Sequence, residues 1–329
     1  MIVNKNIKII FNYILGPLLF ILLSYVIVQQ IRIKSNFLES WFFIKSSFDN
    51  TSIFYFLFVV VLMGINWSLE AIKWKISVRQ VQKVSFSTAC KAVFSGISFS
   101  IIMPNRTGEY LGRVLYMEEG KRLRMVALTV LGSISQLIVT LFFGLLAIAV
   151  FSNYFSDSNT TKTLSIWAIS ICAIGFLLFF SLFYFKIELI VKLLARWKFL
   201  KKYADVIQEL EQISNNVLLK LIFISVIRYF VFMLQYYLLF KFFGVEIVWL
   251  QAIGATAILF LIMAIMPTIA LFEIVQKIVV ANELFYLFTT NLLGVGFVIT
   301  TIWLVNLILP AIIGSLLIGR IKLFKIKNE

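Results

Sequence analysis

Residues 103–113 read MPNRTGEYLGR, a proline followed closely by three charged side chains in an otherwise apolar region. The apolar segment Ser87–Met103 leads into this stretch, and a shorter helix-like segment, Glu109–Met117, leads out of it. A helix of 17 residues reaches about 25 Å, less than the roughly 30 Å hydrocarbon core of a bilayer. Pro104 breaks a helix because its ring removes a backbone donor and clashes with the preceding turn. The stretch therefore predicts a re-entrant helical hairpin over residues 87–117.

The composition of the chain places this hairpin in a membrane. Hydrophobic residues make up 61% of the 329 residues and charged residues 14%, whereas soluble domains carry about 45–50% apolar and about 25% charged residues. So little polar sequence cannot cover a soluble globule of this size, which excludes a soluble enzyme, a coiled coil and a disordered chain. The chain contains no histidine, so a Ser-His-Asp triad and a His-ligated metal are excluded as well.

Six stretches are long and apolar enough to cross a bilayer, which requires about 20 residues. We therefore predict an all-α integral membrane protein, a polytopic helix bundle that forms a single membrane domain over residues 1–329. The predicted spans are Ile9–Val28, Ile53–Leu69, Val126–Phe151, Leu164–Phe185, Val217–Phe240 and Leu292–Ile318.

The basic residues indicate the orientation of these spans, because cytoplasmic loops are enriched in Lys and Arg. Both flanks of the first hairpin, Lys73–Lys83 and Arg113–Arg124, are strongly positive, so the hairpin is predicted to return to the cytoplasmic side from which it entered. The same rule places 22 of the 30 basic residues on the cytoplasmic side and six outside. We expect both termini in the cytoplasm and the protein in the inner membrane of a bacterium.

A second break of the same kind lies about half a chain further on. Leu250–Met266 ends at Pro267, and the helix-like segment Ile269–Ala281 follows, which predicts a second re-entrant hairpin over residues 250–281 on the outer side. Both breaks read Met-Pro, and the two segments are offset by 163 to 164 residues. We interpret them as parts of an inverted repeat, which is a transporter architecture when broken helices meet near the midplane. The two repeats cover about residues 53–151 and 217–318.

Ionisable side chains inside the membrane cost at least about 2.5–3.5 kcal/mol each and by default indicate function. Arg228 lies near the centre of the fifth predicted span and needs a partner, for which the repeat supplies Glu109 and Glu273. Gln235, seven residues after Arg228, shares its helix face. These side chains are therefore candidates for a site inside the bilayer.

Each hairpin also carries an acid and a base four residues apart, which share a helix face and can pair. They are Glu109 and Arg113 in the first hairpin and Glu273 and Lys277 in the second. Arg106 and the N-cap type Thr107 precede the first acid, and the amides at the start of the returning helix favour an anion such as a lipid phosphate. Two interpretations stay open for both hairpins: the charges bind a headgroup, or they neutralise one another and close the hairpin.

Another polar set, Asn66, Glu70 and Lys73, lies on one face at the end of the second predicted span. Trp67 and Trp74 beside it are typical of the aromatic belt at a membrane surface. We interpret the set as an interfacial polar cap rather than as part of a site.

Three stretches resemble a known family, the lysylphosphatidylglycerol synthase transmembrane region, which is the flippase-like portion of the multiple peptide resistance factor. They are residues 66–67 (NW), 83–87 (KVSFS) and 103–113. The family motif runs roughly Pro-Gly-x-x-Gly-Glu-x-x-Arg; here Asn105 replaces its first Gly, whereas the later Gly, Glu and Arg are retained. Residues 266–273 resemble its second motif less closely, because TIAL replaces a Gly-rich run before the acid. The resemblance covers nearly the whole chain and implies paired re-entrant helices that bind a lipid and move it between leaflets.

We therefore predict a flippase-like protein that binds and translocates an anionic phospholipid or polyprenyl-linked lipid. The alternative is a non-transporting scaffold that binds lipid, a glycosyltransferase or another cell-envelope partner. The predicted substrate-binding residues are Arg106, Thr107, Glu109, Arg113, Arg228, Gln235, Glu273 and Lys277.

The same interpretation limits the chemistry that we expect. The full synthases carry a C-terminal aminoacyl-transferase domain, which a chain ending at Glu329 is expected to lack. We expect no enzyme activity, no cofactor and no metal, because no nucleophile–base pair or metal cluster is visible; a lipid-modifying role is the weakest interpretation. The expected partners are membrane lipids, an envelope-biosynthesis enzyme and a second copy of the chain, but not nucleic acid.

Overall fold

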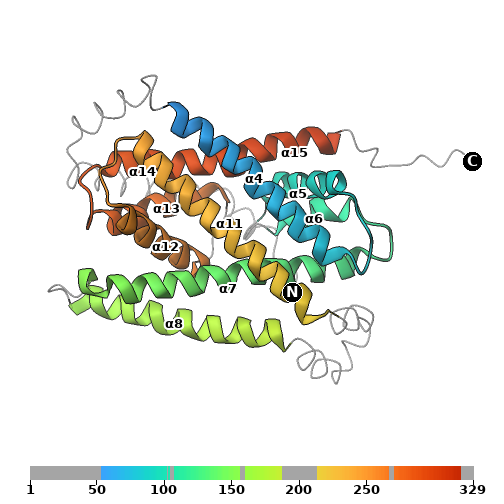
Figure 1. The fold of residues 1–329 in the computed structure, drawn as a ribbon, viewed down its shortest axis with the longest axis horizontal. Coiled ribbons are helices and arrows are strands. Elements are labelled where there is room, and N and C mark those ends of the chain that lie inside the picture. The colour runs from blue at the N-terminus through green and yellow to red at the C-terminus, as the bar shows by residue number, and fades with distance from the viewer. Residues whose placement is uncertain are drawn as a thin grey trace, which may run out of the picture.

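The computed structural model describes residues 53–101, 103, 107–155, 160–186, 213–266 and 270–319 as a bundle of helices (Figure 1). The helices are α4 (Ile53–Val78), α5 (Phe86–Ser100), α6 (Gly108–Val114), α7 (Arg122–Phe155), α8 (Thr160–Phe185), α11 (Asn215–Phe242), α12 (Trp249–Ile265), α13 (Ala270–Phe285), α14 (Leu292–Trp303), the π-helix η3 (Leu304–Ile308) and α15 (Leu309–Gly319). The prediction of an all-α protein is confirmed for these residues.

Within the described residues, five helical segments are long and apolar enough to cross a membrane, and each corresponds to a predicted span. They are Ile53–Val78, Arg122–Ser152, Trp167–Phe185, Asn215–Phe242 and Leu292–Ile318. The predicted span Ile9–Val28 lies outside the described residues. The main difference is in α4, which continues nine residues beyond the predicted end at Leu69. The charges after Leu69 therefore lie on the same helix as the apolar segment.

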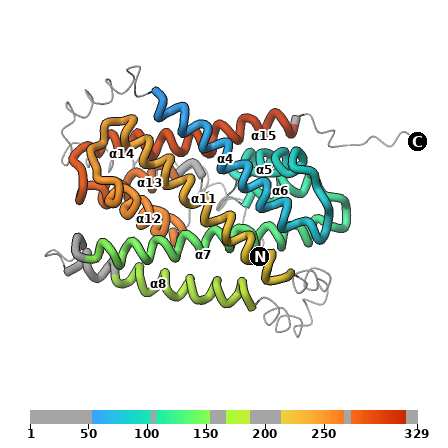
Figure 2. The backbone as a smooth tube through the Cα atoms, viewed as in Figure 1, coloured from blue at the N-terminus to red at the C-terminus, as the bar shows by residue number. Residues whose placement is uncertain are grey.

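Each of the two segments predicted to break at a proline contains two separate helices. α5 and α6 flank the first break, and α12 and α13 flank the second; Pro104 and Pro267 themselves lie outside the described residues. In Figures 1 and 2, α5 and α6 lie near the end of the bundle where α4 finishes and α7 begins, whereas α12 and α13 lie near the opposite end.

The helices α5 and α6 pack closely because each contributes a glycine to their contact. A Cβ atom on Gly112 of α6 would lie 2.3 Å from the backbone nitrogen of Gly96 in α5 and 2.4 Å from the carbonyl oxygen of Ser95. Small residues at such a crossing let two helix backbones approach in a membrane, where no hydrophobic effect drives them together. This contact holds α6, and the charges that it carries, firmly against α5.

Local chemistry sets the start of α5 and the end of α11, the helix that precedes α12. The hydroxyl of Ser85 accepts from the backbone N–H of Thr88 and caps α5, which satisfies one of the unpaired donors of its first turn. α11 ends at Phe242, and Gly244, two residues further on, has a φ of 61°, a conformation that glycine adopts without steric cost. Gly244 and Val245 donate to carbonyls of the last turn over 3.3 and 2.9 Å, a Schellman motif that directs the chain into α12.

Candidate functional site

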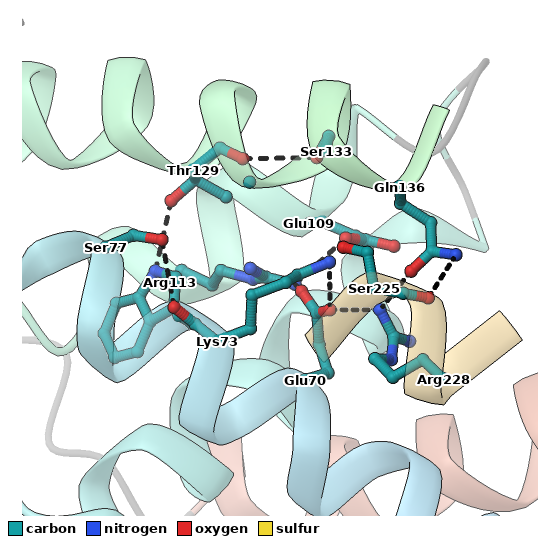
Figure 3. Close-up of polar contacts among 12 residues, drawn as sticks. Glu70, Lys73, Ser77, Glu109, Arg113, Thr129, Ser133, Gln136, Ser225 and Arg228 are labelled. Carbon is teal, nitrogen blue, oxygen red and sulfur yellow. Dashed lines mark hydrogen bonds and ion pairs between the residues drawn. The ribbon is translucent and has the colours of Figure 1, made fainter. Parts of the chain in front are cut away.

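A cluster of five buried or partly buried ionisable side chains lies where α4, α6 and α11 meet. We name Glu70, Lys73, Glu109, Arg113 and Arg228 the charge cluster. Its centre is Glu70 on α4, which is 7% exposed. One carboxylate oxygen accepts from Arg113 over 3.0 Å, and the other pairs with Lys73 over 2.9 Å and with Arg228 (Figure 3). A single carboxylate thus joins cations from three helices.

Arg228, on α11, is held by side chains of two neighbouring helices. Its Nε donates to Asn66 Oδ1 over 2.8 Å, and its Nη1 contacts Glu70 and, over 3.4 Å, Gln136 Oε1 of α7. The guanidinium also lies 5.8 Å from the centre of the Trp67 ring, a favourable cation–π distance. An arginine that is 6% exposed is therefore paired and hydrogen-bonded, as a buried charge requires.

Two sequence-based interpretations are wrong at this point. We expected Glu109 or Glu273 to pair with Arg228, whereas the ion pair is formed by Glu70. We also interpreted Asn66, Glu70 and Lys73 as a polar cap rather than as part of a site, but all three are buried in the bundle, and Glu70 and Lys73 join the charge cluster. Both errors come from ending the second predicted span at Leu69, because Glu70 and Lys73 were then not considered as part of the helix that packs inside the bundle. The signal was available, since an acid on the face of a long apolar helix indicates function by default.

Arg113 connects α6, the helix after the first break, to this centre. Its Nη2 donates to Glu70 and, over 3.1 Å, to Glu109 Oε2 one turn earlier on α6. The predicted i,i+4 pair of Glu109 and Arg113 is therefore present, with Glu70 as a second acceptor. Thr107 is the N-cap residue of α6, as its residue type predicted, but its backbone is helical and its side chain makes no capping hydrogen bond. Arg106 lies outside the described residues.

The other predicted pair lies on α13, the helix after the second break. Lys277 Nζ donates to Glu273 Oε1 over 2.5 Å, one turn apart on α13. Glu273 is 5% exposed, and the Lys277 side chain is 15% exposed. Each helix that follows a break thus carries a paired acid and base in its first turns.

A cavity of about 370 Å³ lies between these two pairs. Its charged lining comes from α4, both broken segments and α11, namely from Glu70, Lys73, Glu109, Arg228 and Lys277. The remaining lining is mainly aromatic and aliphatic and comprises Trp67, Leu137, Tyr229, Phe232, Tyr236, Phe260, Ile302, Trp303 and Leu307, with the polar Ser133, Gln136, Thr140 and Asn306 between them. The cavity therefore offers charged groups and an extensive apolar surface to the same ligand.

Three predicted site residues do not line the cavity but contact residues that do. Arg113 and Glu273 hold charged lining residues through the bonds described above. Gln235 of α11 donates to the Val59 carbonyl over 3.0 Å and accepts from Asn306 over 3.3 Å. Asn306 lies in the π-helix η3, a type of local irregularity frequent at functional sites. Gln235 thus positions a lining residue instead of contacting the cavity itself.

The electrostatics of the site favour an anion. The charge cluster contains three cations and two carboxylates, so it carries one excess positive charge, and the Glu273–Lys277 pair adds none. In a surrounding of low dielectric constant an uncompensated buried charge is costly. A singly charged anion in the cavity would balance the cluster.

Comparison with known proteins agrees with this membrane architecture. Residues 13–281, most of the chain, match the family described as Lysylphosphatidylglycerol synthase TM region. Comparisons with curated proteins and with solved structures give no match. The matched residues include α4, both broken segments up to Ala281 and every residue of the charge cluster. The chain is a multi-pass membrane protein that belongs to the lysylphosphatidylglycerol synthase TM region family, the flippase-like family.

Proposed function

We propose that this protein binds the anionic headgroup of a phospholipid or polyprenyl-linked lipid in the cavity and moves the lipid between leaflets. The observation that carries the proposal is a cavity lined from both broken helix segments beside a buried cluster with one excess positive charge. Soluble anions would need only the charged part of this lining. A lipid also uses the aromatic and aliphatic part.

The cavity is suited to a headgroup in size and in chemistry. Its volume of about 370 Å³ lies in the range of roughly 300–1,000 Å³ found for small-molecule sites. Lys73, Arg228 and Lys277 supply cationic donors for phosphate oxygens, and charge-assisted hydrogen bonds of this kind are the strong ones. The apolar lining is available to the glycerol or isoprenoid carbons that follow the phosphate.

We further propose that the two broken segments are re-entrant hairpins of an inverted repeat, open to opposite sides of the membrane. Their placement near opposite ends of the bundle (Figure 2) supports this, as do the matching pairs Glu109–Arg113 and Glu273–Lys277. A site between two such segments suits alternating access. The distribution of basic residues favours the α5–α6 end as the cytoplasmic one.

Cysteine labelling tests this topology. In a variant with both native cysteines replaced by alanine, single cysteines at the exposed positions Lys83 and Glu119 flank the first hairpin, and Glu246 and Thr290 flank the second. A membrane-impermeant maleimide should label the first two only from the cytoplasmic side and the last two only from the outside. Labelling of Lys83→Cys and Glu119→Cys from opposite sides would instead show that α5–α6 crosses the membrane.

A reconstitution experiment tests transport. Purified protein in vesicles should move fluorescent, headgroup-anionic phosphatidylglycerol between leaflets at least about tenfold faster than protein-free vesicles, with a smaller effect on zwitterionic phosphatidylcholine, because the excess positive charge of the site favours an anion. Equal rates with and without protein would contradict the proposed transport, and the alternative of a lipid-binding scaffold that does not transport would remain. Equal acceleration of both lipids would contradict the proposed preference for an anionic headgroup.

A further inference from the structure

Glu70 occupies the groups that an incoming phosphate would use. Its carboxylate contacts Lys73 and Arg228, and both of these cations line the cavity. Glu70 itself lines the cavity as well. The two cavity-facing cations of the charge cluster are therefore already paired with a carboxylate.

We propose that Glu70 is a built-in competitor for the lipid phosphate, which weakens headgroup binding and thereby allows the lipid to leave. This inference rests on the proposed function and assigns Glu70 a role in release. A carboxylate and a phosphate present the same kind of charged oxygen acceptors to Lys and Arg. A phosphate in the cavity therefore has to share or displace the contacts of Glu70.

Arg113 makes such an exchange possible, because it does not line the cavity and can stay bound to Glu70. Arg113 donates to both Glu70 and Glu109 over 3.0 and 3.1 Å, and Lys73 is on the same helix as Glu70, three residues away. When a phosphate takes over contacts with Arg228, Glu70 keeps Arg113 as its partner. Glu70 thus stays compensated throughout the exchange.

Weak binding is an advantage for a protein that moves its ligand. A permeating ligand must be bound favourably enough to enter and weakly enough to leave, as selectivity filters illustrate. Three cations without Glu70 would hold a phosphate far more strongly than the cluster does with it. The counter-charge therefore lowers affinity in favour of turnover.

A purely structural role for Glu70 makes the opposite prediction. If the carboxylate only neutralised its neighbours, its removal would leave uncompensated buried cations, disturb the positions of Arg113 and Arg228, and weaken both folding and lipid binding. If it competes with the phosphate, its removal strengthens lipid binding. The sign of the change in affinity separates the two roles.

The experiment compares Glu70→Gln with the wild-type protein and with Glu118→Gln, the same change at an exposed acid outside the cluster. Dioctanoyl-phosphatidylglycerol is titrated into each protein in detergent by calorimetry, and translocation is measured in vesicles. We expect Glu70→Gln to bind on the order of tenfold more tightly, the effect typical of one nearby charge, and to translocate more slowly. Glu118→Gln should change neither.

Two further results complete the test. If Glu70→Gln does not give a monodisperse protein, Glu70→Asp, which retains the charge on a shorter side chain, should bind more tightly by a smaller factor. Affinity that is unchanged or weaker in the folded variant overturns the inference, while wild-type transport leaves the proposed function in place. A wild-type protein that neither binds nor moves the lipid overturns the proposed function itself.

Discussion

Arg228→Met is expected to reduce anionic lipid translocation at least about thirtyfold. Truncating one partner of a buried, hydrogen-bonded charge pair costs about 2–5 kcal/mol, and each 1.4 kcal/mol is a factor of ten. Methionine is unbranched and apolar, so it fills space near α4 while it removes the donors to Asn66, Glu70 and Gln136. The substitution also removes the excess positive charge of the cluster.

The matched control is Lys220→Met, the same kind of change at an exposed position on the same helix. It should leave translocation within about twofold of wild type, since exposed charges contribute little. Arg228→Lys should fall between the two, because lysine retains the charge but not the planar fork that reaches several acceptors. Transport by Arg228→Met at the wild-type rate would mean that Arg228 serves only the packing of α11 against α4.

Gly112→Ala is expected to destabilise the protein by about 3 kcal/mol, the upper end of the usual cost of overpacking. The added Cβ would lie 2.3 Å from the Gly96 nitrogen and 2.4 Å from the Ser95 carbonyl oxygen. Both atoms belong to the backbone of α5, so α6 has to move away as a unit. The readouts are the yield of monodisperse protein and its thermal unfolding midpoint in detergent.

Gly175→Ala provides the control for this prediction. Gly175 lies in α8, and a Cβ there would meet no atom within 4 Å. Its midpoint should be unchanged or slightly higher, because alanine has the better helix propensity. Equal midpoints for both variants would show that α5 and α6 do not depend on this close contact. A selective loss for Gly112→Ala would also move Arg113, the next residue, and should therefore reduce transport.

Local sequence features predicted the helices well. Five of the predicted spans coincide with long apolar helices, because a hydrophobic run of sufficient length is a property of neighbouring residues. The two Met-Pro breaks separate α5 from α6 and α12 from α13 for the same kind of reason, since proline acts on its own turn. The paired side chains of α6 and of α13 are four residues apart, so helix geometry alone brings them together.

The end of α4 was harder to predict, and the site depends on it. Asn66, Glu70 and Lys73 interrupt an apolar sequence, so a hydropathy pattern places the membrane boundary at Leu69 although the helix continues to Val78. Burial of these side chains depends on helices that lie around them, which composition does not show. The sequence could indicate that Arg228 needs an acid, but not which one.

The amino-acid sequence by itself therefore determined a multi-pass helical membrane protein, its two broken segments and its family. Only the tertiary structure decided that Glu70, 158 residues from Arg228, forms the centre of the charged site and that both broken segments line one cavity. The physical reason is the sequence separation over which each interaction acts. Hydropathy, helix breaking and i,i+4 pairing act between residues close in sequence, whereas the partner of a buried charge is set by which helix faces pack together.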